Sequence, residues 1–186
     1  MSSKNLRSDA RRNRDAVLAT AMRVLGQKPD ASIQEIADAS GVGRTTVYRN
    51  FPAREDLARA LFAVVVEEQR AIVAAAVAQG GTAAEILRRL GPEILAVGER
   101  YRFLDVHRDL VTEDPHERPG PEDPLLTWLT AAHESGAIHA GLPPHWAYAM
   151  VRALAVGANE EVAAGRASPA EAGRLLGETL VRTFTA

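Results

Sequence analysis

The stretch from Ser32 to Phe51, SIQEIADASGVGRTTVYRNF, decides the fold because it predicts two short helices joined by a tight turn. Ser32 is placed to cap the first helix, and Glu35, three residues later, completes a capping box. Gly41 is expected to end that helix, because a residue without Cβ adopts the left-handed conformation at low cost. The second helix begins almost at once, so the pattern is a helix-turn-helix.

The second helix has one apolar face and one polar face that carries no carboxylate. At roughly 100° per residue, Val47 and Phe51 share the apolar azimuth. Thr45, Thr46 and Arg49 point away from it, Tyr48 and Asn50 lie on the flanks, and Arg44, nearer the apolar azimuth, is long enough to reach past the packed surface. Such side chains donate hydrogen bonds to phosphates or base edges in a major groove. The alternative is the solvated polar face of an ordinary helical hairpin.

Composition separates a basic end from an acidic remainder. The first 54 residues contain ten Lys and Arg against five Asp and Glu, whereas the rest contain twelve against nineteen. The positive end favours approach to a polyanion. The chain has no cysteine, and neither its polar N-terminus nor its short apolar runs predict a secretory signal or a membrane span. We therefore expect a cytoplasmic location and no contact with a membrane.

The run IADASGVGRTTVYRNFPAREDLARAL, from Ile36 to Leu61, resembles the DNA-binding domain of the TetR family of bacterial transcriptional regulators. The resemblance covers roughly residues 12–62, about a quarter of the chain. It implies that Arg54 occupies a position where the family often has a phosphate-binding residue. We predict an all-α protein in which residues 1–52 form the DNA-binding domain, with a basic arm at residues 1–11, and residues 53–186 a helical effector-binding and dimerisation domain.

Turn and cap signals divide the remainder into further helices. We expect helices over residues 12–26, 53–79, 99–111, 123–135, 144–164 and from Ser168 onward, with a capping box at Thr82 and Glu85. Gly91 and Pro92 are expected to kink or split the helix that begins there. The helix over residues 53–79 would span roughly 40 Å and link the DNA-binding end to the rest of the chain.

The last two predicted helices indicate a homodimer. The stretch from Trp146 to Ala158 is apolar almost all round, with Arg152 its only charge, so it must be covered on all faces. A twofold four-helix bundle provides that cover, and the resemblance implies dimerisation through the same helices. The alternative is a central helix in a monomer. The expected interface residues are Ala153, Gly157, Gly173, Leu176, Gly177 and Leu180, and we expect a bulky residue at position 177 to disrupt the dimer.

A dimer would present two copies of the second helix to successive major grooves of a palindromic operator. The groove contacts are expected from Thr45, Thr46 and Arg49, with Arg44 suited to guanine. Further contacts to phosphate or base edges are expected from Gln34, Tyr48, Asn50 and Arg54.

By resemblance, the second domain holds a small-molecule effector that releases a repressor from its operator. The bulky or polar candidates to line that site are Tyr101, Phe103, His107, Arg108, Trp128 and His133. Their aromatic and cationic character suits an amphipathic, anionic compound.

Two other functions remain open at this stage. One is a DNA-binding protein that senses nothing. The other is a helical-bundle metalloenzyme, suggested by the Glu-x-x-His spacing of Glu113 and His116, but Pro115 interrupts that motif and no second copy occurs. No cofactor-binding loop or catalytic motif is present, so we expect neither an enzyme nor a bound metal or cofactor.

Overall fold

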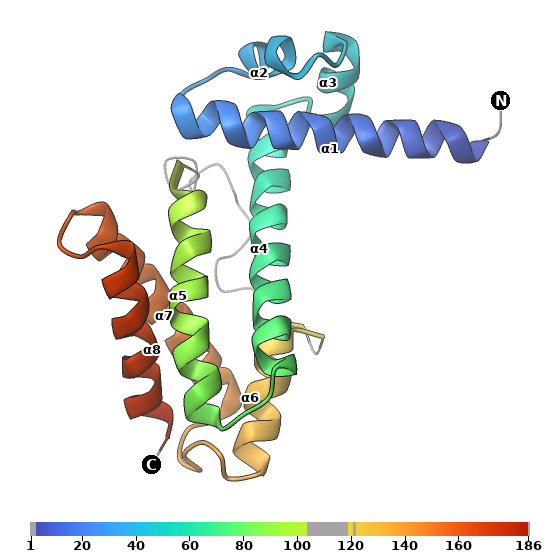
Figure 1. The fold of residues 1–186 in the computed structure, drawn as a ribbon. Coiled ribbons are helices and arrows are strands. Elements are labelled where there is room, and N and C mark those ends of the chain that lie inside the picture. The colour runs from blue at the N-terminus through green and yellow to red at the C-terminus, as the bar shows by residue number, and fades with distance from the viewer. Residues whose placement is uncertain (1–2, 104–118, 121, 186) are drawn as a thin grey trace. The chain divides into compact units, whose positions relative to one another are not determined.

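The structure is a computed structural model that describes residues 3–103, 119–120 and 122–185 (Figure 1). Within these residues it contains helices and no strand, as predicted. The helices are α1 (Ser3–Gln27), α2 (Ile33–Ser40), α3 (Arg44–Asn50), α4 (Arg54–Ala78), α5 (Ala83–Arg100), α6 (Pro124–Glu134), α7 (Pro144–Ala163) and α8 (Pro169–Phe184). None of them is long and apolar enough to cross a membrane.

The described residues divide into two compact units, and the division falls inside α4. Residues 3–65 and 100–103 form the first unit, and residues 66–99 with 119–120 and 122–185 form the second. In the first unit α1 packs against α2 and α3. The core of this unit contains Val17, Leu18, Ala21, Leu25, Ile36, Val47, Phe51, Leu57 and Leu61.

The first helix is longer than predicted. It begins at Ser3, so the described part of the expected arm, residues 3–11, has helical backbone. The sequence before Gly26 contains no proline or glycine to stop a helix. Because propagation adds one hydrogen bond for each residue fixed, the helix anchored by Val17 and Leu18 can extend towards the N-terminus.

In the second unit α7 packs against α6 and α8, and the core forms between these helices, α5 and the end of α4. Leu87, Leu90, Leu129, Leu180 and Phe184 are fully buried there. The helix α4 ends before Gly80 and Gly81, both of which have positive φ. The Arg89 guanidinium donates to the carbonyls of Ala76 and Gly80, at 2.6 and 3.1 Å, and so ties this end of α4 to α5.

Of the two predicted outcomes at Gly91 and Pro92, a kink or a split, the split is wrong, because α5 is a single helix through both residues. It runs through both residues because α8 packs directly onto them. A Cβ added at Gly173 would lie 2.7 Å from the Cα of Pro92, and one added at Gly177 would lie 2.9 Å from the carbonyl oxygen of Arg88. This close packing holds the helix together although proline cannot donate a hydrogen bond. After α5, residues 101–103 are not α-helical, and the rest of the helix predicted over residues 99–111 lies outside the described residues.

Four of the residues predicted to form the dimer interface, all on α8, are covered within the protomer. Gly173, Leu176, Gly177 and Leu180 are all buried, and Leu180 has no exposed surface. The apolar stripe of α8 therefore packs on α5 and the core of the protomer. A bulky residue at Gly177 would disrupt the fold of the protomer itself.

Candidate DNA-binding surface and effector region

The turn between α2 and α3 is fixed by local hydrogen bonds. The Ser32 hydroxyl accepts from the amide of Glu35 at 3.2 Å, and the Glu35 carboxylate accepts from the amide of Ser32 at 2.8 Å, which confirms the capping box. Gly41 has φ 68°, as predicted for the end of α2. The Ser40 hydroxyl then donates to the carbonyl of Ala37 at 2.8 Å and accepts from the amide of Val42 at 3.1 Å. These contacts set the direction in which α3 leaves the turn.

The helix α3 buries its apolar face and exposes the polar one. Val47 and Phe51 are each 1% exposed, whereas the side chains at positions 44, 45, 48 and 49 are exposed. Thr46 and Asn50 are partly buried, and the Asn50 side-chain amide donates to the carbonyl of Thr46 at 2.8 Å. Gln34 is exposed on α2. The exposed set is thus Gln34, Arg44, Thr45, Tyr48 and Arg49, with Thr46 and Asn50 at its edge.

Arg44 is held by a carboxylate that the sequence pattern of α3 did not reveal. Its Nε and Nη2 donate to the two oxygens of Asp38, on α2, at 2.8 and 3.0 Å. Both side chains remain largely exposed. The hydrogen bond and the charge of Asp38 raise the pKa of Arg44, which stays protonated. Helical periodicity places Arg44 nearer the apolar face of α3, but its guanidinium lies at the surface, where it pairs with Asp38.

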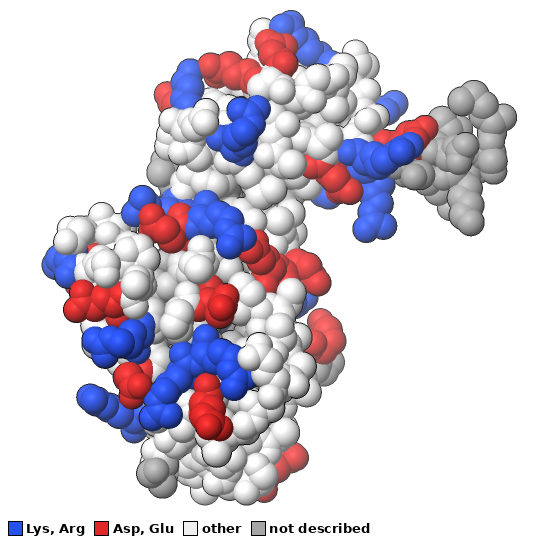
Figure 2. All heavy atoms as spheres, viewed as in Figure 1, with Lys and Arg blue, Asp and Glu red and all other residues white. Residues whose placement is uncertain are grey.

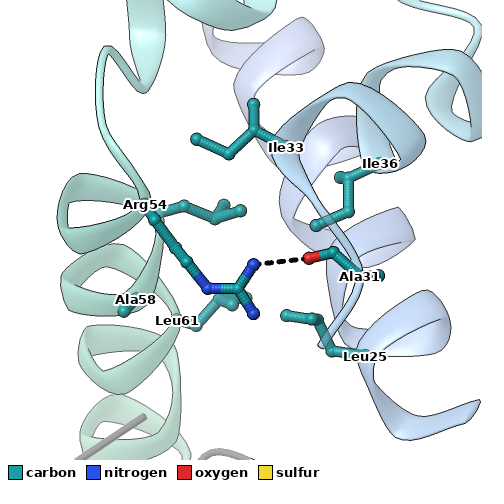
Figure 3. Close-up of a pocket in the computed structure, with 8 residues that line it drawn as sticks. Leu25, Ala31, Ile33, Ile36, Arg54, Ala58 and Leu61 are labelled. Atoms are coloured by element: carbon teal, nitrogen blue, oxygen red, sulfur yellow. Dashed lines mark hydrogen bonds between the residues drawn. The ribbon is translucent and has the colours of Figure 1, made fainter. Parts of the chain in front are cut away.

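Arg54 is engaged within the first unit. Its Nη1 donates to the carbonyl of Ala31 at 2.7 Å (Figure 3), and its Nη2 donates to the carbonyl of Pro29 at 3.1 Å. Its stem crosses a cavity of about 10 Å³ whose other lining residues are Leu25, Ala31, Ile33, Ile36, Leu57, Ala58 and Leu61. This cavity has room for about one water molecule and none for an organic effector. The contacts give Arg54 a role in joining α4 to the loop before α2.

Two further contacts support the same unit. The Lys28 ammonium donates to Glu35 at 2.7 Å. That hydrogen bond, together with those from Ser32, lowers the pKa of Glu35 to about 2. The Arg14 guanidinium lies over the Phe51 ring, 5.5 Å from its centroid, beside the end of α3. The capping box thus has a charge partner that its sequence pattern does not include.

Acidic and basic side chains are mixed on the surface of the second unit (Figure 2). On the face shown in Figure 2, acidic and basic side chains alternate over the second unit. Several of them pair with one another, such as Arg88 with Glu178 at 3.0 Å and Arg166 with Glu161 at 2.7 Å. The net negative charge of this part of the chain is therefore spread out and partly neutralised.

The predicted effector residues fall in both units of the chain. Tyr101 and Phe103 belong to the first unit, where their ring centroids lie 6.3 Å apart. Trp128 and His133 belong to the second, on α6; Trp128 packs partly buried against its core, and His133 contacts the carbonyl of Ala140 at 3.1 Å. His107 and Arg108 lie outside the described residues, as do Glu113 and His116. Within the described residues, no group of three or more His, Asp or Glu is arranged to hold a metal ion.

A buried polar cluster in the second unit was not predicted. Asp123, 4% exposed, caps α6 by accepting from the amides of Leu125 and Leu126 at 3.0 and 3.1 Å. Its other oxygen accepts from the Tyr148 hydroxyl at 3.3 Å and lies 3.6 Å from Nε of Arg70. Burial, and then the charge of Asp123, raise the pKa of Tyr148. The cap is local to the start of α6, but only the fold brings α4 and α7 to it.

The helices α7 and α8 enclose a surface groove of about 390 Å³. Its lining includes Ala153, Leu154, Gly157, Ala158, Leu175 and Thr179, with the Glu161–Arg166 ion pair. Leu175 is 46% exposed, Val156 on α7 is 40% exposed, and Trp146 at the start of α7 is 63% exposed. The prediction that α7 is apolar on all faces is thus matched by apolar surface that the protomer leaves uncovered.

Known proteins that are similar to this chain are bacterial transcriptional regulators. A family model described as "Bacterial regulatory proteins, tetR family" matches residues 17–61. The HTH-type transcriptional repressor LfrR of Mycolicibacterium smegmatis is 42% identical over 170 residues, which cover 78% of this chain and 89% of LfrR.

Solved structures agree with this relationship. The crystal structure of LfrR from Mycobacterium smegmatis in complex with proflavine has a TM-score of 0.63 at 28% identity, covering 91% of this chain and 95% of that one. NalD, the secondary repressor of the MexAB-OprM multidrug efflux pump in Pseudomonas aeruginosa, shares the fold, with a TM-score of 0.62 at 20% identity and coverage of 95% and 98%. These relatives are transcriptional regulators and not enzymes, and the chain belongs to the TetR family of bacterial transcriptional regulators.

Proposed function

We propose that this regulator is a repressor that binds a palindromic operator as a homodimer and leaves it when a small molecule binds. The observation that carries the proposal is the exposed face of α3, which has hydrogen-bond donors and two arginines but no carboxylate of its own. The similarity to a repressor that covers 78% of the chain supports the direction of regulation. We place the functional boundary at Pro52, between a DNA-binding domain of residues 1–52 and an effector-binding and dimerisation domain of residues 53–186.

The DNA contacts are assigned by exposure. Thr45 and Arg49 enter the major groove, with Arg44 at the start of the same helix. Tyr48 and Gln34 are exposed at its sides and reach phosphates or base edges, whereas Thr46 and Asn50 contribute at the edge of the surface. Arg54 donates two of its N–H groups to the loop before α2, so we assign it a supporting role.

The dimer interface is moved from the buried face of α8 to the exposed surface of α7 and α8. Ala153 and Gly157 remain in it, and Trp146, Val156 and Leu175 replace the four buried residues. The partner at this surface is a second copy of the chain, because a twofold axis brings the same apolar surface of two protomers into contact. In such a dimer the two copies of α3 would meet successive major grooves about 34 to 36 Å apart.

The effector is proposed to bind within the second domain. Trp128 and His133 on α6, together with Tyr101, Phe103, His107 and Arg108, remain the aromatic and cationic candidates. The buried group of Arg70, Asp123 and Tyr148 adds polar partners beside α6. Because LfrR has been crystallised with proflavine, proflavine is the first compound to test.

The test is selection of binding sites by the purified full-length protein from randomised double-stranded DNA, followed by footprinting. We expect a palindrome with half-sites about one helical turn apart, and release of that duplex by proflavine or by another aromatic compound from a screen. A protein that selects no sequence at low salt would overturn the proposal. Selection of a site that no compound releases would instead favour a regulator that senses nothing.

A further inference from the structure

The pair between Arg44 and Asp38 leaves one edge of the guanidinium free. Asp38 accepts from Nε and Nη2 at 2.8 and 3.0 Å, so it occupies the side edge of the planar group. A guanidinium has five N–H donors in a fixed fork. Three of them, two on Nη1 and one on Nη2, are not used by this contact, and two of these three lie parallel along the end edge.

We infer that Asp38 is a positioning residue that presents the end edge of Arg44 to guanine in the operator. The inference rests on the proposed function. Guanine offers two acceptors, O6 and N7, in the major groove, and their spacing matches two parallel N–H donors. Arg44 stands at the first position of α3, where the residues of a recognition helix meet base edges. The two contacts use different edges of the guanidinium, so Arg44 keeps its bond to Asp38 while it reads the base.

The ion pair of Arg44 and Asp38 contributes little to the stability of the fold. The two side chains are 60% and 49% exposed, and an exposed ion pair contributes little to folding. Its geometry, however, removes the rotational freedom of a long side chain that would otherwise be lost on binding DNA. A fixed plane also favours a bidentate base contact over a contact to a phosphate, which Arg44 could reach from many rotamers.

Electrostatic repulsion alone predicts a different effect of removing the Asp38 carboxylate. A carboxylate near the reading surface repels phosphate, so its removal should strengthen binding to all DNA. If Asp38 also positions Arg44, removal of Asp38 should in addition weaken discrimination between bases at one base pair of each half-site. The two effects are measured separately, as affinity for random duplex and as preference for guanine at one position.

The experiment uses the full-length protein and the duplex that the wild type selects from randomised DNA. Titrations of that duplex and of three versions with another base pair at the guanine position give the preference. For Asp38→Asn we expect the preference for guanine to fall about tenfold, while binding to random duplex strengthens. Arg44→Ala should remove the same preference. Asp38→Asn added to Arg44→Ala should then remove no more, because the two residues act as one unit.

Asp9→Asn is the matched control. Asp9 belongs to another exposed ion pair of the same unit, with Arg12 on α1, and its replacement changes the charge by the same amount. It should strengthen binding to all duplexes alike and leave the guanine preference unchanged. Helix content and the melting temperature of each variant are measured alongside.

The results separate two kinds of failure. A wild-type protein that selects no sequence overturns the proposed function and this inference with it. A wild-type protein that selects an operator, combined with an Asp38→Asn variant of unchanged guanine preference, overturns the inference alone. The same holds if Arg44→Ala changes no base preference.

Discussion

Arg49 shows how one exposed side chain on α3 can be tested apart from the fold. It points into solvent on the face opposite Val47, and none of the core residues depends on it. We expect Arg49→Ala to weaken binding to the selected operator by about 1 to 3 kcal/mol, since a base or phosphate contact of an arginine is lost. Titration of labelled duplex measures the loss, and circular dichroism should show unchanged helix content.

Arg182→Ala serves as the control for this variant, because Arg182 is an exposed arginine on α8. It removes the same charge from the second unit and should leave operator affinity nearly unchanged. Equal losses for the two variants would mean that the net charge of the protein, and not α3, governs binding. Loss of helix content in Arg49→Ala would place this residue in the core.

Glu35 links one residue to the acid stability of the DNA-binding unit. Its hydrogen bonds with Lys28 and Ser32 lower its pKa to about 2, below the value of about 4.5 expected in an unfolded chain. A depressed carboxyl pKa adds stability above the unfolded pKa and loses it as pH falls towards the folded one. We expect Glu35→Gln to be less stable than the wild type at pH 7, with a difference that shrinks between about pH 4.5 and pH 2.

Thermal melts of the two proteins at pH 7, 4 and 2.5 test this dependence. Lys28→Met is a useful companion, because it removes the largest cause of the shift and keeps the carboxylate. It should also flatten the acid dependence relative to the wild type. A constant difference between Glu35→Gln and wild type at all three pH values would contradict the role given to Glu35.

Replacing either of two helical glycines by alanine is expected to change the free energy of unfolding, in opposite directions. Gly177 on α8 faces the backbone of α5, and an added Cβ would lie 2.9 Å from the carbonyl oxygen of Arg88. Backbone cannot move aside cheaply, so we expect Gly177→Ala to destabilise the protomer by about 1 to 3 kcal/mol. Urea unfolding monitored by circular dichroism measures the change.

Gly157 on α7 is the matched control, because nothing lies within 4 Å of a Cβ added there. Alanine is the better helix former, so Gly157→Ala should raise the free energy of unfolding of the dissociated protomer by about 0.5 to 1 kcal/mol. If both variants lost the same stability, the close contact between α5 and α8 would be wrong. The sequence pattern had predicted the same role for both glycines, as small residues of one dimer interface.

At the scale of the whole molecule, the exposed apolar surface of α7 and α8 governs assembly. We expect Leu175→Glu to dissociate the dimer, because it places a charge where the proposed interface excludes water. Sedimentation equilibrium should then show the 20.0 kDa chain where the wild type shows twice that mass. Operator affinity should fall with dissociation, since one protomer reads only one half-site.

Ala96→Glu controls for the added charge, because Ala96 is an exposed alanine on α5. It should sediment as the wild type does. A wild-type protein that sediments as a single chain at micromolar concentration would overturn the interface. A Leu175→Glu variant that remains a dimer would mean that other surfaces hold the two copies together.

Local signals in the sequence determined the helix-turn-helix and most helix boundaries. The capping box of Ser32 and Glu35, the left-handed Gly41 and the Asp123 and Ser168 caps each act over a few residues, so their chemistry can be read from neighbours in the chain. The exposed face of α3 follows in the same way, because helical periodicity fixes which residues share an azimuth with Val47.

Only the tertiary structure decided which apolar surfaces are already covered and which charges meet. Leu176 and Leu180 form a stripe that α5 and the core bury, while α7 leaves Val156 exposed, and periodicity alone cannot say which partner an apolar stripe meets. Likewise, Asp38 reaches Arg44 only because the turn at Gly41 brings α2 beside the start of α3. Contacts between residues on different elements depend on how those elements pack, and that information is absent from any single stretch of the chain.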